Sequence, residues 1–130
     1  MSRIEYRVAR MLHKHNLPII SHNKVLHGTK YRPDFLVKKG RTVVVIEVDE
    51  YQHERYDRHK EKDREQRLTD RLNDMGHDVY VLRFDPYKAR LSKLMIDIVD
   101  IITRLLDDSP VDHILDRVRA DVQGHVIRVY

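Results

Sequence analysis

The segment VVVIEVDE, residues 43–50, decides the fold, because it joins an apolar strand to a group of acidic residues. Residues 43–48 are mostly β-branched and apolar, which is typical of a central strand covered on both faces of a sheet. The preceding segment YRPDFLV, residues 31–37, also alternates apolar residues with charged ones. Carboxylates avoid apolar strands unless something pairs with them. What pairs with Asp34, Glu47 and Asp49 is therefore the functional question that this sequence raises.

Composition limits the class of protein. The chain has 130 residues, enough for a single domain over 1–130 with one modest core. Hydrophobic residues make up 41% and charged residues 35%, and the net charge of +4 suits a polyanionic partner without requiring one. Cysteine is absent, which excludes disulfides and thiolate zinc sites.

Two features of the sequence bear on where the protein is expected to be found. No apolar run approaches the ~18 residues that cross a bilayer, and the N-terminal segment MSRIEYRVAR lacks the apolar core of a signal peptide. We therefore expect no membrane partner and an intracellular location, cytoplasmic or nuclear, with a viral or phage origin left open.

Hydrophobic periodicity predicts an α/β fold, a mixed β-sheet flanked by helices in the order α-β-β-β-α-β-α. A capping box at Ser2 and Glu5 starts the first helix, and Asp85 and Pro86 are expected to start the last long one. The expected elements are a helix to about residue 16, strands at 18–21, 30–37 and 42–50, a helix at 54–75, a strand at 78–84, a helix from 86, and a tail with a short helical piece and a strand near 125–130.

The turn-forming segment KKGR, residues 38–41, predicts an antiparallel hairpin. With its last two residues as the turn, Asp34 lies opposite Glu47, and opposite Cβ atoms are roughly 4.5–5.5 Å apart. Carboxylates this close repel unless a pKa rises or a divalent cation binds. Oxygen ligands suit Mg²⁺ or Mn²⁺. The alternative is that both residues mark a strand end and lie in water.

Further along, the ordered set PD, EVD and QH at residues 33–34, 47–49 and 52–53 resembles the PD-(D/E)XK nuclease superfamily. The longer string RPDF…VIEVDEYQH…R…MG…VLRF is most similar to its very-short-patch-repair-like branch. The match runs from the first helix through Phe84, about two thirds of the chain. The resemblance implies a restriction-endonuclease-like fold and a Mg²⁺- or Mn²⁺-dependent endodeoxyribonuclease that hydrolyses phosphodiester bonds, by nicking or by double-strand cutting.

The resemblance also implies roles for particular residues. Asp34 and Glu47 would bind the cation, with the Val48 carbonyl and Asp49 as further ligands. Glu5 corresponds to the acid that many members carry on their first helix, although position three of a capping box explains it equally well.

Asp49 departs from the family pattern, because the superfamily has a lysine at this position. Asp49 would then be an additional metal ligand that leaves activation of the water to the ion. Alternatively, Gln52 and His53 take over, with His53 as general base or acid near its usual pKa. This second reading resembles the E-D-x-H-D variant of the branch, with Asp63 as its closing aspartate.

Basic residues near the hairpin and on the charged helix are expected to contact a DNA backbone. The apolar stripe of that helix, extended backwards from Leu68, reaches Arg64, so we expect Arg64 on the buried side. The broad apolar stripe of the last long helix is compatible with a homodimer. Zinc binding at His13 and His15 is disfavoured. The alternative function is a catalytically inactive nucleic-acid-binding module of the same fold. The candidate backbone contacts are Lys38, Lys39, Arg41, Arg64 and Arg67.

Overall fold

The computed structural model of the chain describes residues 2–26, 29–49, 58–87 and 90–130. Its elements follow the predicted order, including a short helix and a last strand in the C-terminal tail, and add one strand between these two. No helix within the described ranges is both long and apolar enough to span a membrane. The elements are α1 (Arg3–Lys14), β1 (Ile19–His22), β2 (Phe35–Lys39), β3 (Thr42–Val48), α2 (Arg58–Asp74), β4 (Asp78–Phe84), α3 (Leu91–Leu106), α4 (Asp112–Arg117), β5 (Ala120–Gln123) and β6 (Val126–Val129).

The strands form one six-stranded mixed sheet in the order β1-β2-β3-β4-β6-β5. β3 and β6 both run parallel to β4, and the remaining neighbours are antiparallel. The prediction of a mixed α/β sheet flanked by helices is therefore confirmed. β3 and β4 lie at the centre, as the continuous apolar run of residues 43–46 requires.

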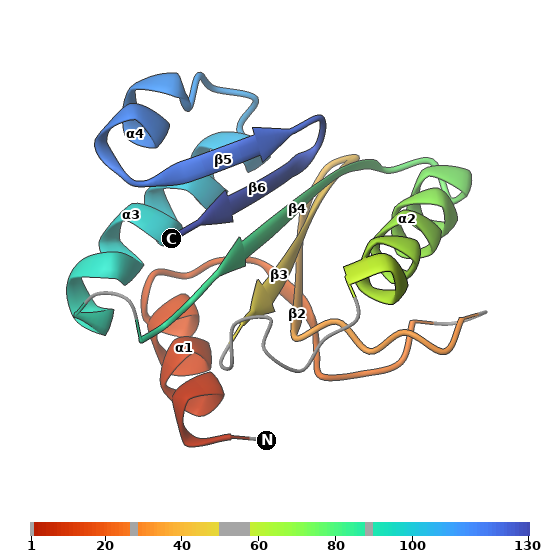
Figure 1. The fold of residues 1–130 in the computed structure, drawn as a ribbon, viewed down its shortest axis with the longest axis horizontal. Helices are drawn as coiled ribbons and strands as arrows, with labels where there is room; N and C mark the ends of the chain where they lie inside the picture. The colour runs from red at the N-terminus through yellow and green to blue at the C-terminus, as the bar shows by residue number, and fades with distance from the viewer. Residues whose placement is uncertain (1, 27–28, 50–57, 88–89) are drawn as a thin grey trace.

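Helices cover both faces of the sheet (Figure 1). One face packs against α1, α3 and α4 through the larger core, in which Phe35, Ile46 and Phe84 are among the fully buried side chains. The other face packs against α2 through a smaller core that includes Val45 and Leu68. Successive residues of a strand point to opposite faces, so Glu47, two residues after Val45, lies on the α2 side.

The β2–β3 hairpin has the predicted register. Lys39 pairs with Thr42 and Phe35 with Ile46, so Asp34 precedes β2 at the position opposite Glu47. The turn residue Gly40 has φ +60, which glycine adopts at no steric cost.

Strand β2 begins five residues later than expected, at Phe35 rather than at residue 30. The preceding segment closes a loop instead, in which the Leu26 amide donates to the Tyr31 carbonyl at 2.8 Å. Pro33 has no N–H to offer a neighbouring strand, which favours the loop.

The predicted start of the last long helix is wrong. Asp85 Oδ1 accepts a hydrogen bond from the Tyr87 amide at 2.8 Å and so stabilises a turn. α3 begins only at Leu91, and Arg90 at its N-cap makes no side-chain capping bond. The side chain of Asp85 therefore stabilises a turn. Aspartate followed by proline is common in turns as well as at helix N-termini, so the sequence pattern did not distinguish the two.

The strand expected near residues 125–130 is present as β6, but the sequence did not predict β5 or how the two strands pair. β5 and β6 form a hairpin around Gly124, which has φ +60. β6 then extends the sheet by pairing in parallel with β4, which places Arg128 beside Arg83. β5 is short and mostly exposed, so its sequence carries no core-facing alternation.

Candidate functional site

The candidate site lies where β3 and β4 end, on the face covered by α2. The carboxyl ends of parallel strands are where open α/β sheets most often bind ligands. The parallel ladder sets Glu47 beside Arg83, and Val48 beside Phe84. Asp34 comes from the other side, directly before β2. Strand register alone thus brings two acidic residues and one arginine together.

Asp34 is fixed by the strand it faces. Its Oδ2 accepts a hydrogen bond from the Val48 amide at 2.7 Å. Burial, followed by a hydrogen bond to Glu5 and by the charges of neighbouring carboxylates, raises the pKa of Asp34 to about 7. Burial and then the charge of Asp34 also raise the pKa of Glu47 well above its usual value, against the opposing effect of Arg83. Both carboxyl groups are therefore held in positions where their charged forms are disfavoured.

Glu5 joins this pair from α1. Its backbone N–H donates to Ser2 Oγ at 3.1 Å, so the predicted N-cap is present. Its buried carboxyl group is directed elsewhere: it raises the pKa of Asp34 and lies 3.9 Å from His22 Nε2. Helix capping thus uses the backbone of Glu5, and its side chain belongs to the acidic group.

Asp49 is held by an arginine from the neighbouring strand. Arg83 Nη1 donates to Asp49 Oδ1 at 3.0 Å, and Arg83 Nε donates to Glu65 Oε2 at 3.0 Å. Arg128 Nη2 reaches the same Glu65 oxygen at 3.3 Å. Arg83 and Glu65 are both buried, with relative exposures of 6% and 8%. These four residues form an ionic chain that runs from the end of β3 under α2 to β6.

Within the ionic chain, α2 contributes Glu65, whereas the apolar stripe of the helix had predicted that Arg64 faces the sheet. α2 buries Glu65, Leu68, Thr69 and Leu72 against the sheet, whereas Arg64 is exposed. The expectation that Arg64 faces inward is therefore wrong. Helical neighbours at i−3 and i−4 both continue a stripe, and Leu68 is continued by the residue three positions back.

The remaining residues of the helix region are placed as follows. Arg67 is exposed and donates from Nη1 to the Tyr31 hydroxyl at 3.4 Å. Asp63 is exposed on the same helix. Gln52 and His53, the candidates for activating the water, lie outside the described residues.

The basic residues of the hairpin lie far from the acidic pair. Lys38, Lys39 and Arg41 flank the turn, at the end of β3 opposite to Glu47. At roughly 3.3 Å per residue, the length from Thr42 to Glu47 is about 17 Å. Lys39 forms an ion pair with Asp107, and Arg41 Nε donates to the Gly76 carbonyl at 3.2 Å. The hairpin that positions the acids therefore separates them from these three basic residues.

The donor set fits a hard divalent cation with a small number of protein ligands. Within the described parts of the chain, no group of three or more His, Asp or Glu side chains is arranged to hold a metal ion. Mg²⁺, however, keeps several waters and is usually bound by one or two carboxylates together with substrate phosphates. Asp34 and Glu47 supply such a pair, and a cation between them would offset the repulsion that raises both pKa values.

The sequence patterns did not assign Glu65 or Arg128, and they did not predict that Arg83 is paired with acids inside the protein. One signal for Arg83 was its place in the strand DVYVLRF, where it lies on the same face of the sheet as the buried Val79 and Val81. A buried arginine on a central strand requires acidic partners. No such signal marked Arg128, because the strand pairing that brings it there was unknown.

Comparisons with known proteins give no further guide to the site. No family model matches the chain. Searches of curated proteins and of solved structures likewise returned no match. The resemblance to the PD-(D/E)XK nucleases consequently stays a prediction from the motif residues.

Proposed function

We propose that this protein is a divalent-metal-dependent DNA endonuclease whose cation is held by Asp34 and Glu47. The observation that carries the proposal is the juxtaposition of these two carboxyl groups at the ends of β2 and β3, with raised pKa values. Two structural acids at a strand end would gain nothing from facing each other, because like charges opposite one another destabilise a sheet.

The chain's own residues would divide the work among them. A bound Mg²⁺ or Mn²⁺ would supply Lewis acidity toward a phosphodiester. The Val48 amide fixes the Asp34 carboxylate in place, and Glu5 completes the acidic group from α1. Arg83 holds Asp49 through an ion pair and favours the charged form of Glu47. The family resemblance alone assigns to His53 the role of accepting the proton of the attacking water.

Arg83 also supplies a positive charge where the family pattern has its lysine. Its guanidinium lies against Asp49, which occupies that position of the motif. Arginine stays protonated at any physiological pH, so it is suited to positioning and charge compensation rather than to accepting a proton. Although Asp49 stands where the family pattern has its lysine, the Arg83 guanidinium therefore still provides a positively charged side chain at this end of β3.

A non-catalytic nucleic-acid-binding module remains the second candidate. The observation that favours it is the ionic chain itself, because Arg83 and Glu65 engage Asp49 from within the protein. An acid held in this way also has a purely structural use.

Supercoiled plasmid incubated with Mg²⁺ or Mn²⁺ tests the proposal. We expect conversion to nicked or linear DNA by the wild-type chain and loss of that conversion in EDTA. Glu47→Gln, which preserves the side-chain size, should abolish cutting. Asp116→Asn removes an exposed carboxylate on α4 and should leave cutting unchanged.

The alternative outcome is equally definite. DNA binding that persists in EDTA, without cleavage in either metal, would contradict the nuclease and support the module. Equal cutting by wild type and Glu47→Gln would place the catalytic group elsewhere in the chain.

A further inference from the structure

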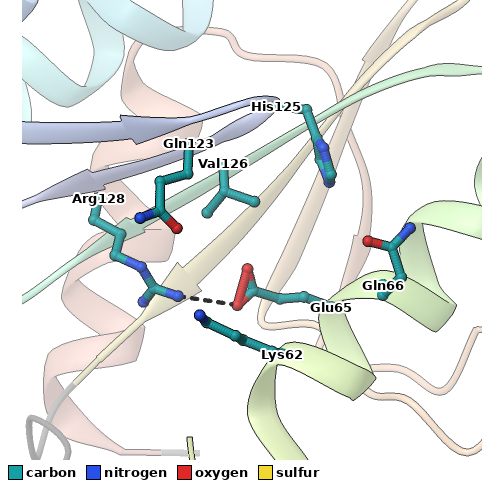
Figure 2. Close-up of a pocket in the computed structure, with 7 residues that line it drawn as sticks. All are labelled: Lys62, Glu65, Gln66, Gln123, His125, Val126 and Arg128. Carbon is teal, nitrogen blue, oxygen red and sulfur yellow. Dashed lines mark hydrogen bonds and ion pairs between the residues drawn. The ribbon is translucent and has the colours of Figure 1, made fainter. Parts of the chain in front are cut away.

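A cavity of about 210 Å³ lies between α2 and the β5–β6 hairpin. This volume exceeds the roughly 30 Å³ that one water occupies in the liquid. Figure 2 shows the side chains that face it from the two elements. They are Lys62, Glu65 and Gln66 from α2, and Gln123, His125, Val126 and Arg128 from the hairpin.

Several lining groups already have protein partners. The Gln66 amide donates to Asp70 Oδ1 at 2.9 Å, and His125 Nε2 lies 3.0 Å from Thr69 Oγ1. Glu65 Oε2 is within hydrogen-bond distance of both Arg83 and Arg128. The one acidic side chain of the lining is therefore compensated from inside the protein.

Positive charge in the cavity is less completely compensated. Lys62 extends from α2 toward the side on which Arg128 reaches Glu65 (Figure 2). Among the residues that the structure describes, Lys62 has no ion-pair partner. Asp121 is opposite Arg128 in the β5–β6 ladder, but it is exposed and makes no ion pair within the described ranges. Two cationic groups thus share one cavity with a single carboxylate that Arg83 also neutralises.

The cavity is joined to the acidic site by the ionic chain. Glu65 forms part of the cavity wall and bonds Arg83, which bonds Asp49 two residues after Glu47. The ionic chain thus links the cavity wall to the strand end that carries the acidic pair.

We propose that the cavity binds a backbone phosphate of the nucleic-acid substrate, through Lys62 and Arg128, beside the phosphate at the acidic pair. Lysine and arginine are the usual phosphate partners in protein–DNA interfaces. Gln123, whose amide has no hydrogen-bond partner within the described residues, offers a further donor. The inference deepens the proposed function, because it assigns a second contact to the same substrate.

The test is the salt dependence of DNA affinity, measured by anisotropy of a labelled duplex in the Glu47→Gln background, which removes cutting. Lys62→Gln replaces an exposed helix residue by another good helix former, so folding should be kept. The slope of log K against log salt should fall by about one in magnitude, as loss of one phosphate contact requires. Lys93→Gln on α3 is the matched control, since it removes one charge from the opposite face of the sheet.

The outcomes separate the two proposals. Equal slopes for Lys62→Gln and Lys93→Gln would overturn the cavity assignment while metal-dependent plasmid cutting still supported the nuclease. Absence of DNA binding by the full chain would overturn both. Stabilisation by inorganic phosphate that needs Lys62, together with unchanged DNA affinity, would assign the cavity to free phosphate and contradict the inference.

Discussion

Glu47 and Arg83 are direct neighbours across the parallel β3–β4 ladder, and Arg83 makes its ion pairs with Asp49 and Glu65 from that position. One arginine thus influences both described acids at the end of β3, Glu47 and Asp49. It favours the charged form of Glu47 and bonds the carboxylate two residues further on. The site is consequently organised by the neighbouring strand as well as by the hairpin.

Removal of this arginine should be costly for stability. Arg83→Met leaves the buried Glu65 with one partner fewer and should lower the free energy of unfolding by about 3–5 kcal/mol, as breaking a buried ion pair does. The double variant Arg83→Met/Glu65→Leu should lose less than the sum of the two single variants, because the carboxylate that loses its buried ion pair with Arg83 is removed as well. Urea denaturation of the four proteins measures this coupling, and additive losses would show that the pair does not interact.

Stability should depend on pH through Asp34. Its pKa is higher in the folded chain, about 7, than the usual 3.8, so the folded state binds a proton more tightly between these values. The contribution of Asp34 to stability is therefore fully present below about pH 4 and is lost as pH rises to about 7. Asp34→Asn cannot ionise. Without divalent metal, its melting temperature relative to wild type should rise across this window, and a pH-independent difference would contradict the raised pKa.

Divalent cations should reverse that loss. Metal binding requires deprotonated ligands, so Mn²⁺ should raise the melting temperature more above pH 7 than below it. At about 100 times its Kd, a ligand that binds only the folded state adds about 2.7 kcal/mol. Glu47→Gln should show little of this stabilisation. An equal thermal shift in wild type and variant would move the cation to another part of the chain.

Glu5 should influence the acidic pair without holding it in place. Its hydrogen bond and its charge both raise the pKa of Asp34. Glu5→Gln removes the charge, so the pKa of Asp34 should fall, while the Ser2 cap bonds the backbone of residue 5 and should survive. Carboxyl-carbon NMR titration of both proteins measures the shift. An unchanged Asp34 pKa would restrict Glu5 to a structural role.

Much of the fold followed from local sequence signals. The β-branched run of residues 43–48 and the KKGR turn predicted the central strand and the hairpin register, since both depend on residues close in the chain. The start of α3, the strand β5 and the pairing of the predicted last strand did not follow. Asp85 was bound by a turn, and β6 depends on pairing with β4, a contact far along the chain.

The same distinction holds for the site. Asp34 facing Glu47 was predictable because one hairpin sets both positions. The ionic partners Glu65 and Arg128 come from α2 and β6, so only tertiary packing brings them to Arg83. The hairpin lysines are close to the acids in the sequence. Because β3 is extended, however, the turn that carries these lysines lies at the opposite end of the strand from Glu47.

Crystals grown with Mn²⁺ test the central claim most directly. An anomalous difference map should show a manganese peak between the Asp34 and Glu47 carboxylates, within about 2.0–2.6 Å of an oxygen from each, as hard cations require. A map without a peak at that position, or with carboxylate oxygens that point away from each other, would contradict the account.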